Sequence, residues 1–76
     1  MMKLTIVIPA LNEEEAIGSI IQRCLDARVN ITRESPVGEV EIIVVSDGST
    51  DRTADIAHEF ASNHRCVRVI VFERNR

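Results

Sequence analysis

The sequence predicts an α/β fold in which three parallel strands alternate with two helices. Three short apolar segments are separated by two longer segments whose apolar residues recur at helical spacing. We expect strands at about residues 4–8, 41–45 and 67–72, and helices at about residues 13–27 and 51–63. Because crossovers between parallel strands are right-handed in nearly all proteins, these elements form a βαβαβ half of a doubly wound, Rossmann-like sheet, with strand order 3-2-1 and helices mainly on one face.

The first strand and the first helix are indicated by residues near the N-terminus. Leu4–Ile8 is typical of a strand buried on both faces, and Pro9 marks its end because proline lacks the N–H that a ladder needs. Asn12 is the expected helix N-cap, and Glu13–Glu15 lie in the first turn, where Glu15 completes a capping box and carboxylates favour the helix dipole. One apolar helical stripe follows, formed by Ile17, Ile20, Ile21, Cys24 and Leu25.

The middle of the chain is expected to contain a loop, the second strand and the start of the second helix. Val29–Val40 is predicted to be a surface loop, because it combines turn-forming residues with mixed charges. Glu41–Val45 contains a continuous apolar run, which is typical of a central parallel strand covered on both faces. Ser49 or Thr50 is the expected cap of the second helix. The buried stripe of that helix is expected to consist of Thr53, Ile56, Ala57, Phe60 and Ala61.

Length, composition and charge limit the classes of protein to which the chain can belong. With 76 residues and 45% apolar residues, we expect one globular domain, spanning residues 1–76, with a marginal core. The net charge of −3, the scattered basic residues and the presence of only two aromatic residues, Phe60 and Phe72, argue against nucleic-acid binding. No apolar run approaches the roughly 18 residues of a membrane span, so we expect a soluble, cytoplasmic chain that could reach a membrane only through residues outside it. Cys24 and Cys66 are expected to be reduced thiols.

The edge of the first strand lacks a neighbour in this arrangement. An unpaired apolar edge such as Leu4–Ile8 is an aggregation hazard in a soluble protein. We therefore expect another strand to pair there, either from residues outside the chain or from a second copy in a homo-oligomer.

Two polar turns are expected at the carboxyl ends of the first two strands, where open α/β sheets bind ligands. The first is Pro9–Glu13 and the second is Ser46–Asp51. Adjacent parallel strands bring these turns together although they lie far apart in the sequence. The first turn lacks the G-x-G-x-x-G pattern and carries an acidic residue, which repels a pyrophosphate. Both observations argue against the hypothesis that the chain is half of the dinucleotide-binding domain of a dehydrogenase.

The two turns and their flanking strands resemble the start of family 2 glycosyltransferases. The matching segments are Val7–Glu14 and Ile43–Thr53, each following a strand and preceding a helix. The resemblance also covers Val67–Ile70 and Glu73–Arg76, so that only the segment from Val29 to Val40 falls outside it. It implies the glycosyltransferase A-type fold, of which this chain would form the N-terminal part, and a nucleoside diphosphate sugar as the ligand.

The resemblance also implies which residues contact the nucleotide. These are Pro9, Ala10, Leu11, Glu13, Asp47 and Gly48. Asp47 matches a carboxylate that bonds the base, typically the imide N–H of uracil, so a UDP-sugar is the favoured donor. Since an ionised carboxylate only accepts hydrogen bonds, it selects a base edge that offers a donor. Ser46 departs from the family pattern, which has a second Asp there, and this departure bears on base preference.

Catalysis in this family implies further groups that the sequence does not contain. The resemblance implies a divalent cation, Mg²⁺ or Mn²⁺, held by an Asp-x-Asp motif, and a carboxylate base that activates the acceptor hydroxyl. The 76 residues contain no Asp-x-Asp motif and no matching base. We therefore expect no catalytic residue and no metal ligand in the chain, which alone would not transfer a sugar. The alternative is a non-catalytic nucleotide-binding module that acts as a homodimer.

Overall fold

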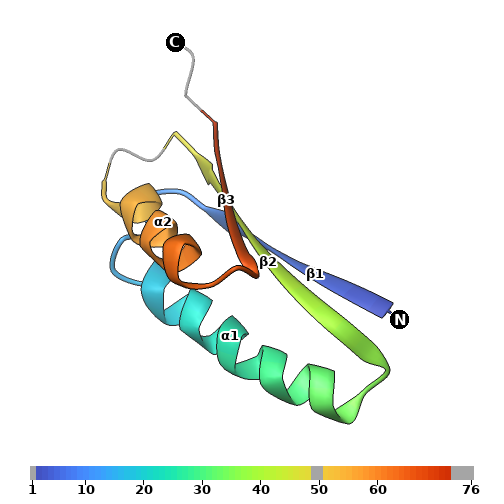
Figure 1. Ribbon diagram of the computed structural model, residues 1–76. Coiled ribbons are helices and arrows are strands. Elements are labelled where there is room, and N and C mark those ends of the chain that lie inside the picture. The colour runs from blue at the N-terminus through green and yellow to red at the C-terminus, as the bar shows by residue number, and fades with distance from the viewer. Residues whose placement is uncertain (1, 49–50, 73–76) are drawn as a thin grey trace.

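The computed structural model describes residues 2–48 and 51–72, and over these ranges it is an α/β structure with three parallel strands and two helices (Figure 1). The elements are β1 (Met2–Ala10), α1 (Ile17–Glu34), β2 (Val37–Asp47), α2 (Thr53–Asn63) and β3 (Val67–Phe72). The sheet order is β1-β2-β3, so β2 is the central strand. The predicted cap residues Ser49 and Thr50 and the closing segment 73–76 lie outside the described residues.

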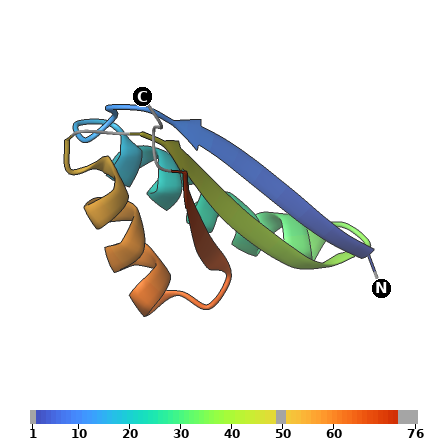
Figure 2. The same cartoon turned by 90° about the horizontal axis from the view of Figure 1, so that it is seen from above.

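The hydrophobic core lies between the sheet and the two helices, which cover the same face of the sheet (Figure 2). Both predicted helical stripes are confirmed. In α1, the fully or nearly fully buried members of the stripe are Ile17, Ile21 and Leu25, and in α2 they are Thr53 and Ala57. The remaining members, which are Ile20, Cys24, Ile56, Phe60 and Ala61, are partly buried against this core.

The second face of the sheet is open in the described part of the chain, so the prediction that the first two strands are buried on both faces was wrong. In β2, burial alternates: Val40, Ile42 and Val44 are buried, whereas the residues between them are only partly covered. In β1, Val7 is 58% exposed. The reason is that side chains alternate between the two faces of a strand and both helices pack on one of them.

Pro9 does not end the first strand, because β1 continues to Ala10 and Pro9 pairs with Val45. The N–H of Ile42 donates to the carbonyl of Cys66 on the β3 side of β2. In a parallel sheet, the backbone N–H and C=O groups of successive residues point to opposite neighbouring strands. The backbone groups of the odd-numbered residues of β2 therefore bond to β1. In the matching register, the backbone groups of the odd-numbered residues of β1 face away from β2. The nitrogen of Pro9 therefore faces the outer edge of the sheet, where no ladder bond is lost.

The segment predicted to be a loop, Val29–Val40, is mostly regular structure. Helix α1 continues to Glu34 and β2 begins at Val37. The hydroxyl of Thr32 donates to the backbone carbonyl of Arg28 at 3.0 Å, so this polar side chain is satisfied within the helix. Turn-forming residues therefore did not end the helix at Ala27 as expected. Gly38 is the extra residue at a register irregularity between β1 and β2, which is the position of a β-bulge.

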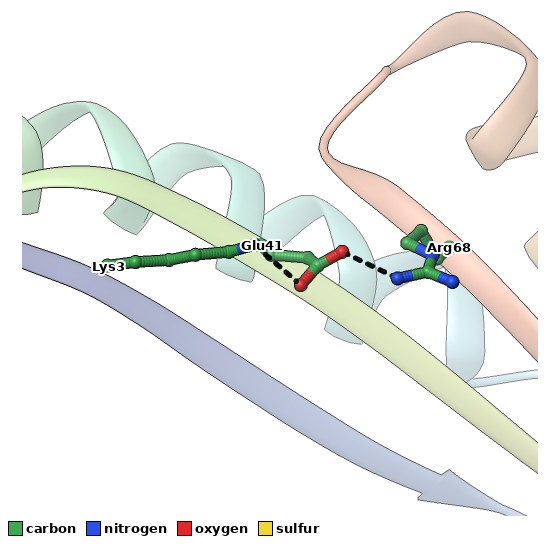
Figure 3. A network of polar contacts seen from close by, with 3 residues as sticks. All are labelled: Lys3, Glu41 and Arg68. Atoms are coloured by element: carbon green, nitrogen blue, oxygen red, sulfur yellow. Dashed lines mark hydrogen bonds and ion pairs between the residues drawn. The ribbon is translucent and has the colours of Figure 1, made fainter.

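The open face of the sheet carries a charged network that joins all three strands (Figure 3). The carboxylate of Glu41 on β2 lies 3.3 Å from the ammonium of Lys3 on β1 and 3.1 Å from the guanidinium of Arg68 on β3. These two hydrogen-bonding cations, Arg68 first, hold the pKa of Glu41 below its usual range. At neutral pH the carboxylate is therefore ionised and links the two edge strands through the central one.

Replacement of Gly18 by alanine is expected to stabilise the protein. A β-carbon at this position would lie 3.7 Å from the ring of Phe60 and 3.8 Å from Ile56, which is ordinary van der Waals contact. Since glycine in a helix costs about 1 kcal/mol relative to alanine, Gly18→Ala should raise the free energy of unfolding by about 0.5–1 kcal/mol. Urea denaturation followed by circular dichroism measures the change.

Gly48→Ala provides the opposite control. Gly48 has a backbone φ of 74°, a conformation that an L-residue adopts at a cost of about 1–2 kcal/mol. This variant should therefore unfold at lower urea concentration than wild type. A loss of stability in Gly18→Ala would show that the contact between α1 and α2 leaves no room for a methyl group.

Candidate functional site

The two predicted ligand turns meet at the carboxyl edge of the sheet. Ala10, the last residue of β1, pairs with Ser46 of β2, so the turn that follows β1 begins beside the end of β2. This turn also contacts the start of α2, as Figure 1 shows at the end of the molecule where the colour changes from blue to cyan. The turn itself includes Asn12 in a left-handed conformation, with φ 53°, which asparagine tolerates better than most residues.

The first helix does not begin as the sequence predicted. Asn12 is not its N-cap: α1 starts at Ile17, the cap residue is Ala16, and no side chain caps it. Glu13–Glu15 precede the helix, and a backbone turn closes there through the N–H of Ala16 and the carbonyl of Glu13 at 2.9 Å. The physical reason is that the backbone N–H groups of Glu13 and Glu14 donate to side chains from another part of the chain and need no N-cap within α1.

Those acceptors are two side chains at the start of α2. The hydroxyl oxygen of Thr53 accepts the N–H of Glu13 at 2.7 Å. One carboxylate oxygen of Asp51 accepts the N–H of Glu14 at 3.2 Å. The other oxygen of Asp51 accepts the N–H of Thr53 at 3.0 Å and also its hydroxyl. We call Asp51 and Thr53, with these bonds, the Asp51–Thr53 clamp.

The clamp depends on an ionised carboxylate. The hydrogen bond from the hydroxyl of Thr53 lowers the pKa of Asp51, and the backbone N–H groups of Thr53 and Glu14 act in the same direction. Partial burial opposes this shift without cancelling it. At neutral pH, Asp51 is therefore ionised and can accept all of these bonds. Thr53 is fully buried.

One pocket gathers five of the six predicted nucleotide-binding residues. Its volume is about 420 Å³, and it is lined by Pro9, Ala10, Leu11, Glu13, Val45 and Asp47. Leu11 is 44% exposed and Ala10 is 5% exposed, so the turn offers an apolar surface that is open on one side. Asp47, an exposed residue at the end of β2, places a carboxylate at this surface.

Gly48, the sixth predicted residue, does not line this pocket. Its N–H donates to the carbonyl of Phe72 at 2.9 Å, and its backbone φ is positive. Ser46, where the family pattern has an Asp, is 1% exposed and lies on the helix-covered face, whereas the next residue, Asp47, lines the pocket. Because successive side chains of β2 point to opposite faces of the sheet, Ser46 and Asp47 lie on different faces.

Val45 lines the pocket but was not predicted as a site residue. One signal in the sequence could have identified it, and the register of the sheet adds a second. Val45 lies two residues before Asp47 and therefore on the same face of β2. It also pairs with Pro9, which was predicted to flank the ligand.

A second pocket of about 370 Å³ lies next to the first and shares Glu13 with it. It is lined by Asn12, Glu13, Glu14, Glu15, Ala16 and Asp51. Although this surface is acidic, residues 2–48 and 51–72 contain no group of three or more His, Cys, Asp or Glu side chains placed to hold a metal ion. The described residues therefore do not fit the divalent cation that the family resemblance implies.

Comparison with known proteins identifies the family. The family model described as glycosyl transferase family 2 matches residues 5–76. The chain belongs to glycosyl transferase family 2. The matched range includes every residue that lines the first pocket, so the resemblance seen in the sequence is confirmed at the level of the family.

Several curated proteins are similar to the chain over most of its length. It is 35% identical over 72 residues to a dolichyl-phosphate beta-glucosyltransferase of Drosophila melanogaster, covering 95% of the chain and 22% of that protein. It is 39% identical over 69 residues to the probable glycosyltransferase YdaM of Bacillus subtilis, covering 91% and 15%. It is 41% identical over 73 residues to a poly(ribitol-phosphate) beta-glucosyltransferase of Bacillus spizizenii, covering 96% and 10%.

The chain therefore spans less than a quarter of the length of these relatives. No solved structure matches it. Across the described part of the chain, neither helix has the length and apolar character that a bilayer crossing requires. Cys24 and Cys66 are free thiols, each partly buried.

Proposed function

We propose that the chain forms the nucleotide-binding part of a glycosyltransferase that transfers a sugar from a nucleoside diphosphate sugar to an acceptor. The observation that carries this proposal is a pocket at the carboxyl edge of the sheet, which joins the turn after β1 to Asp47 at the end of β2. The family supports sugar transfer as the reaction class, because each of the relatives named above is a glycosyltransferase.

The character of the pocket favours the base and ribose of the nucleotide as its occupant. Pro9, Leu11 and Val45 offer apolar contact to a flat, uncharged ring, which is the usual lining of a small-molecule site. Glu13 and Asp47 bring negative charge, which repels a diphosphate. Because an ionised carboxylate accepts hydrogen bonds and donates none, Asp47 favours a base that presents an N–H, such as the imide of uracil.

Titration calorimetry tests this proposal directly. The 76-residue chain is titrated with uridine diphosphate, with cytidine diphosphate as the matched ligand whose ring nitrogen carries no imide hydrogen. We expect saturable binding of uridine diphosphate and weaker binding of cytidine diphosphate. An acceptor-only group that faces another acceptor loses its hydrogen bond, so the difference should be about tenfold or more.

Equal affinity for the two nucleotides would contradict recognition of the uracil imide N–H by Asp47. Absence of any binding, with circular dichroism showing a folded chain, would contradict the proposed nucleotide site as a whole. A spectrum that shows perturbation of the Leu11 and Val45 methyl resonances on addition of uridine diphosphate would place the nucleotide in this pocket.

A further inference from the structure

We propose that Asp51 and Thr53 are positioning residues for the nucleotide pocket, which hold the turn after β1 in its binding position without touching the ligand. This inference rests on the proposed function, because it concerns the affinity of the same pocket. The clamp joins residues that are 37 and 40 positions apart in the sequence, and therefore ties one wall of the pocket to the start of α2.

The clamp and the pocket share Glu13. The N–H of Glu13 donates to the hydroxyl of Thr53, and Glu13 also lines the pocket together with the three residues Pro9–Leu11. Asp51 lines the neighbouring acidic pocket and not the nucleotide pocket, and Thr53 is fully buried. Both residues can therefore act on a nucleotide through the position of Glu13 and its neighbours rather than by contact.

The direction of each hydrogen bond makes the clamp specific to these residue types. An ionised Asp51 can only accept, so the hydroxyl of Thr53 donates to it and keeps a lone pair for the N–H of Glu13. Valine at position 53 preserves the shape and removes both bonds. Serine preserves both bonds. Asparagine at position 51 replaces one carboxylate oxygen by an NH2 group. This group cannot accept a hydrogen bond, so the N–H that faces it, from Thr53 or from Glu14, loses its acceptor.

The test compares the affinity of the folded variants for uridine diphosphate. If the turn without its clamp occupies the binding position for only a tenth of the time, the apparent Kd rises about tenfold. We expect this rise in Thr53→Val and in Asp51→Asn, whereas Thr53→Ser should stay close to wild type. Thr32→Val is the matched control, because the hydroxyl of Thr32 bonds within α1 and Thr32 lines neither pocket.

A second measurement separates the positioning role from a purely structural one. Hydrogen exchange of the Glu13 and Glu14 amides, measured by NMR without nucleotide, should accelerate in Thr53→Val and in Asp51→Asn while the core amide of Ile42 stays protected. Faster exchange together with weaker binding supports the proposal.

The outcomes also distinguish this inference from the proposed function. Binding by wild type with an unchanged Kd in both variants would overturn the positioning role and leave the nucleotide site intact. Failure of the folded wild-type chain to bind any nucleotide would overturn the proposed function, and the positioning role with it.

Discussion

Replacement of Ile42 by alanine should remove a large part of the free energy of unfolding of the protein. Ile42 lies in the central strand, is fully buried, and has Ile6 and Val67 as its neighbours on the adjacent strands. Truncation of a buried isoleucine to alanine costs about 2–5 kcal/mol. The removed atoms no longer contribute their hydrophobic transfer free energy, and the surrounding side chains fill the resulting cavity only in part. A chain of 76 residues has a total stability of roughly 4–11 kcal/mol at the average value per residue. We therefore expect the urea midpoint to fall by a large part of its wild-type value.

Ile43→Ala is the control for this prediction, since it makes the same chemical change one residue further along the same strand. Ile43 lies on the open face and is only partly covered. Its replacement removes the strand preference of isoleucine and some contact with neighbouring side chains, which should lower the free energy of unfolding by about 1 kcal/mol. Equal losses in the two variants, measured by circular dichroism in urea, would contradict the assignment of the core to one face of the sheet.

Replacement of Asp47 by asparagine should weaken the binding of uridine diphosphate by roughly ten- to a hundredfold, because a hydrogen bond to a charged group contributes about 1.5–3 kcal/mol. Asp47 is exposed at the end of β2, so the change removes charge at the pocket without disturbing the core. Titration calorimetry gives the affinity, and urea denaturation of the same sample shows that the stability is close to wild type.

Glu59→Gln is the matched control for Asp47→Asn, because it also converts an exposed carboxylate to an amide. Glu59 lies on α2, outside the residues that line either pocket. This variant should bind uridine diphosphate as wild type does. An affinity loss of similar size in both variants would show that overall charge, rather than a contact with the base, controls binding.

Much of the fold could be predicted from local patterns. The apolar residues of α1 and α2 recur with the period of a helix, and both stripes face the core. The polar turns after the first two strands were expected to meet, because the carboxyl ends of adjacent parallel strands lie at one edge, and five of the six predicted ligand residues line one pocket there. The roles of those residues in binding stay predictions.

The wrong predictions concern residues that are compatible with more than one local conformation. Asn12 is a residue type that favours N-caps, yet its turn is held by Thr53, the first residue of α2, and by Asp51, which precedes that helix. Asn30 and its neighbours have the composition of a loop, yet the hydroxyl of Thr32 bonds within α1 and the helix continues to Glu34. Turn and cap preferences are worth about 1 kcal/mol each, and tertiary contacts of similar size can reverse them.

The sequence by itself determined the alternation of strands and helices, the stripes that form the core, and the family to which the chain belongs. Only the tertiary structure decided that the face of the sheet opposite the helices is open in the described part of the chain, that β1 continues past Pro9, and that Asp51 and Thr53 hold the turn after β1. The physical reason is one of range. Periodicity is repeated every few residues and can be recognised locally, whereas the N–H of Glu13 finds its acceptor 40 residues away, where only the folded chain can bring the two together.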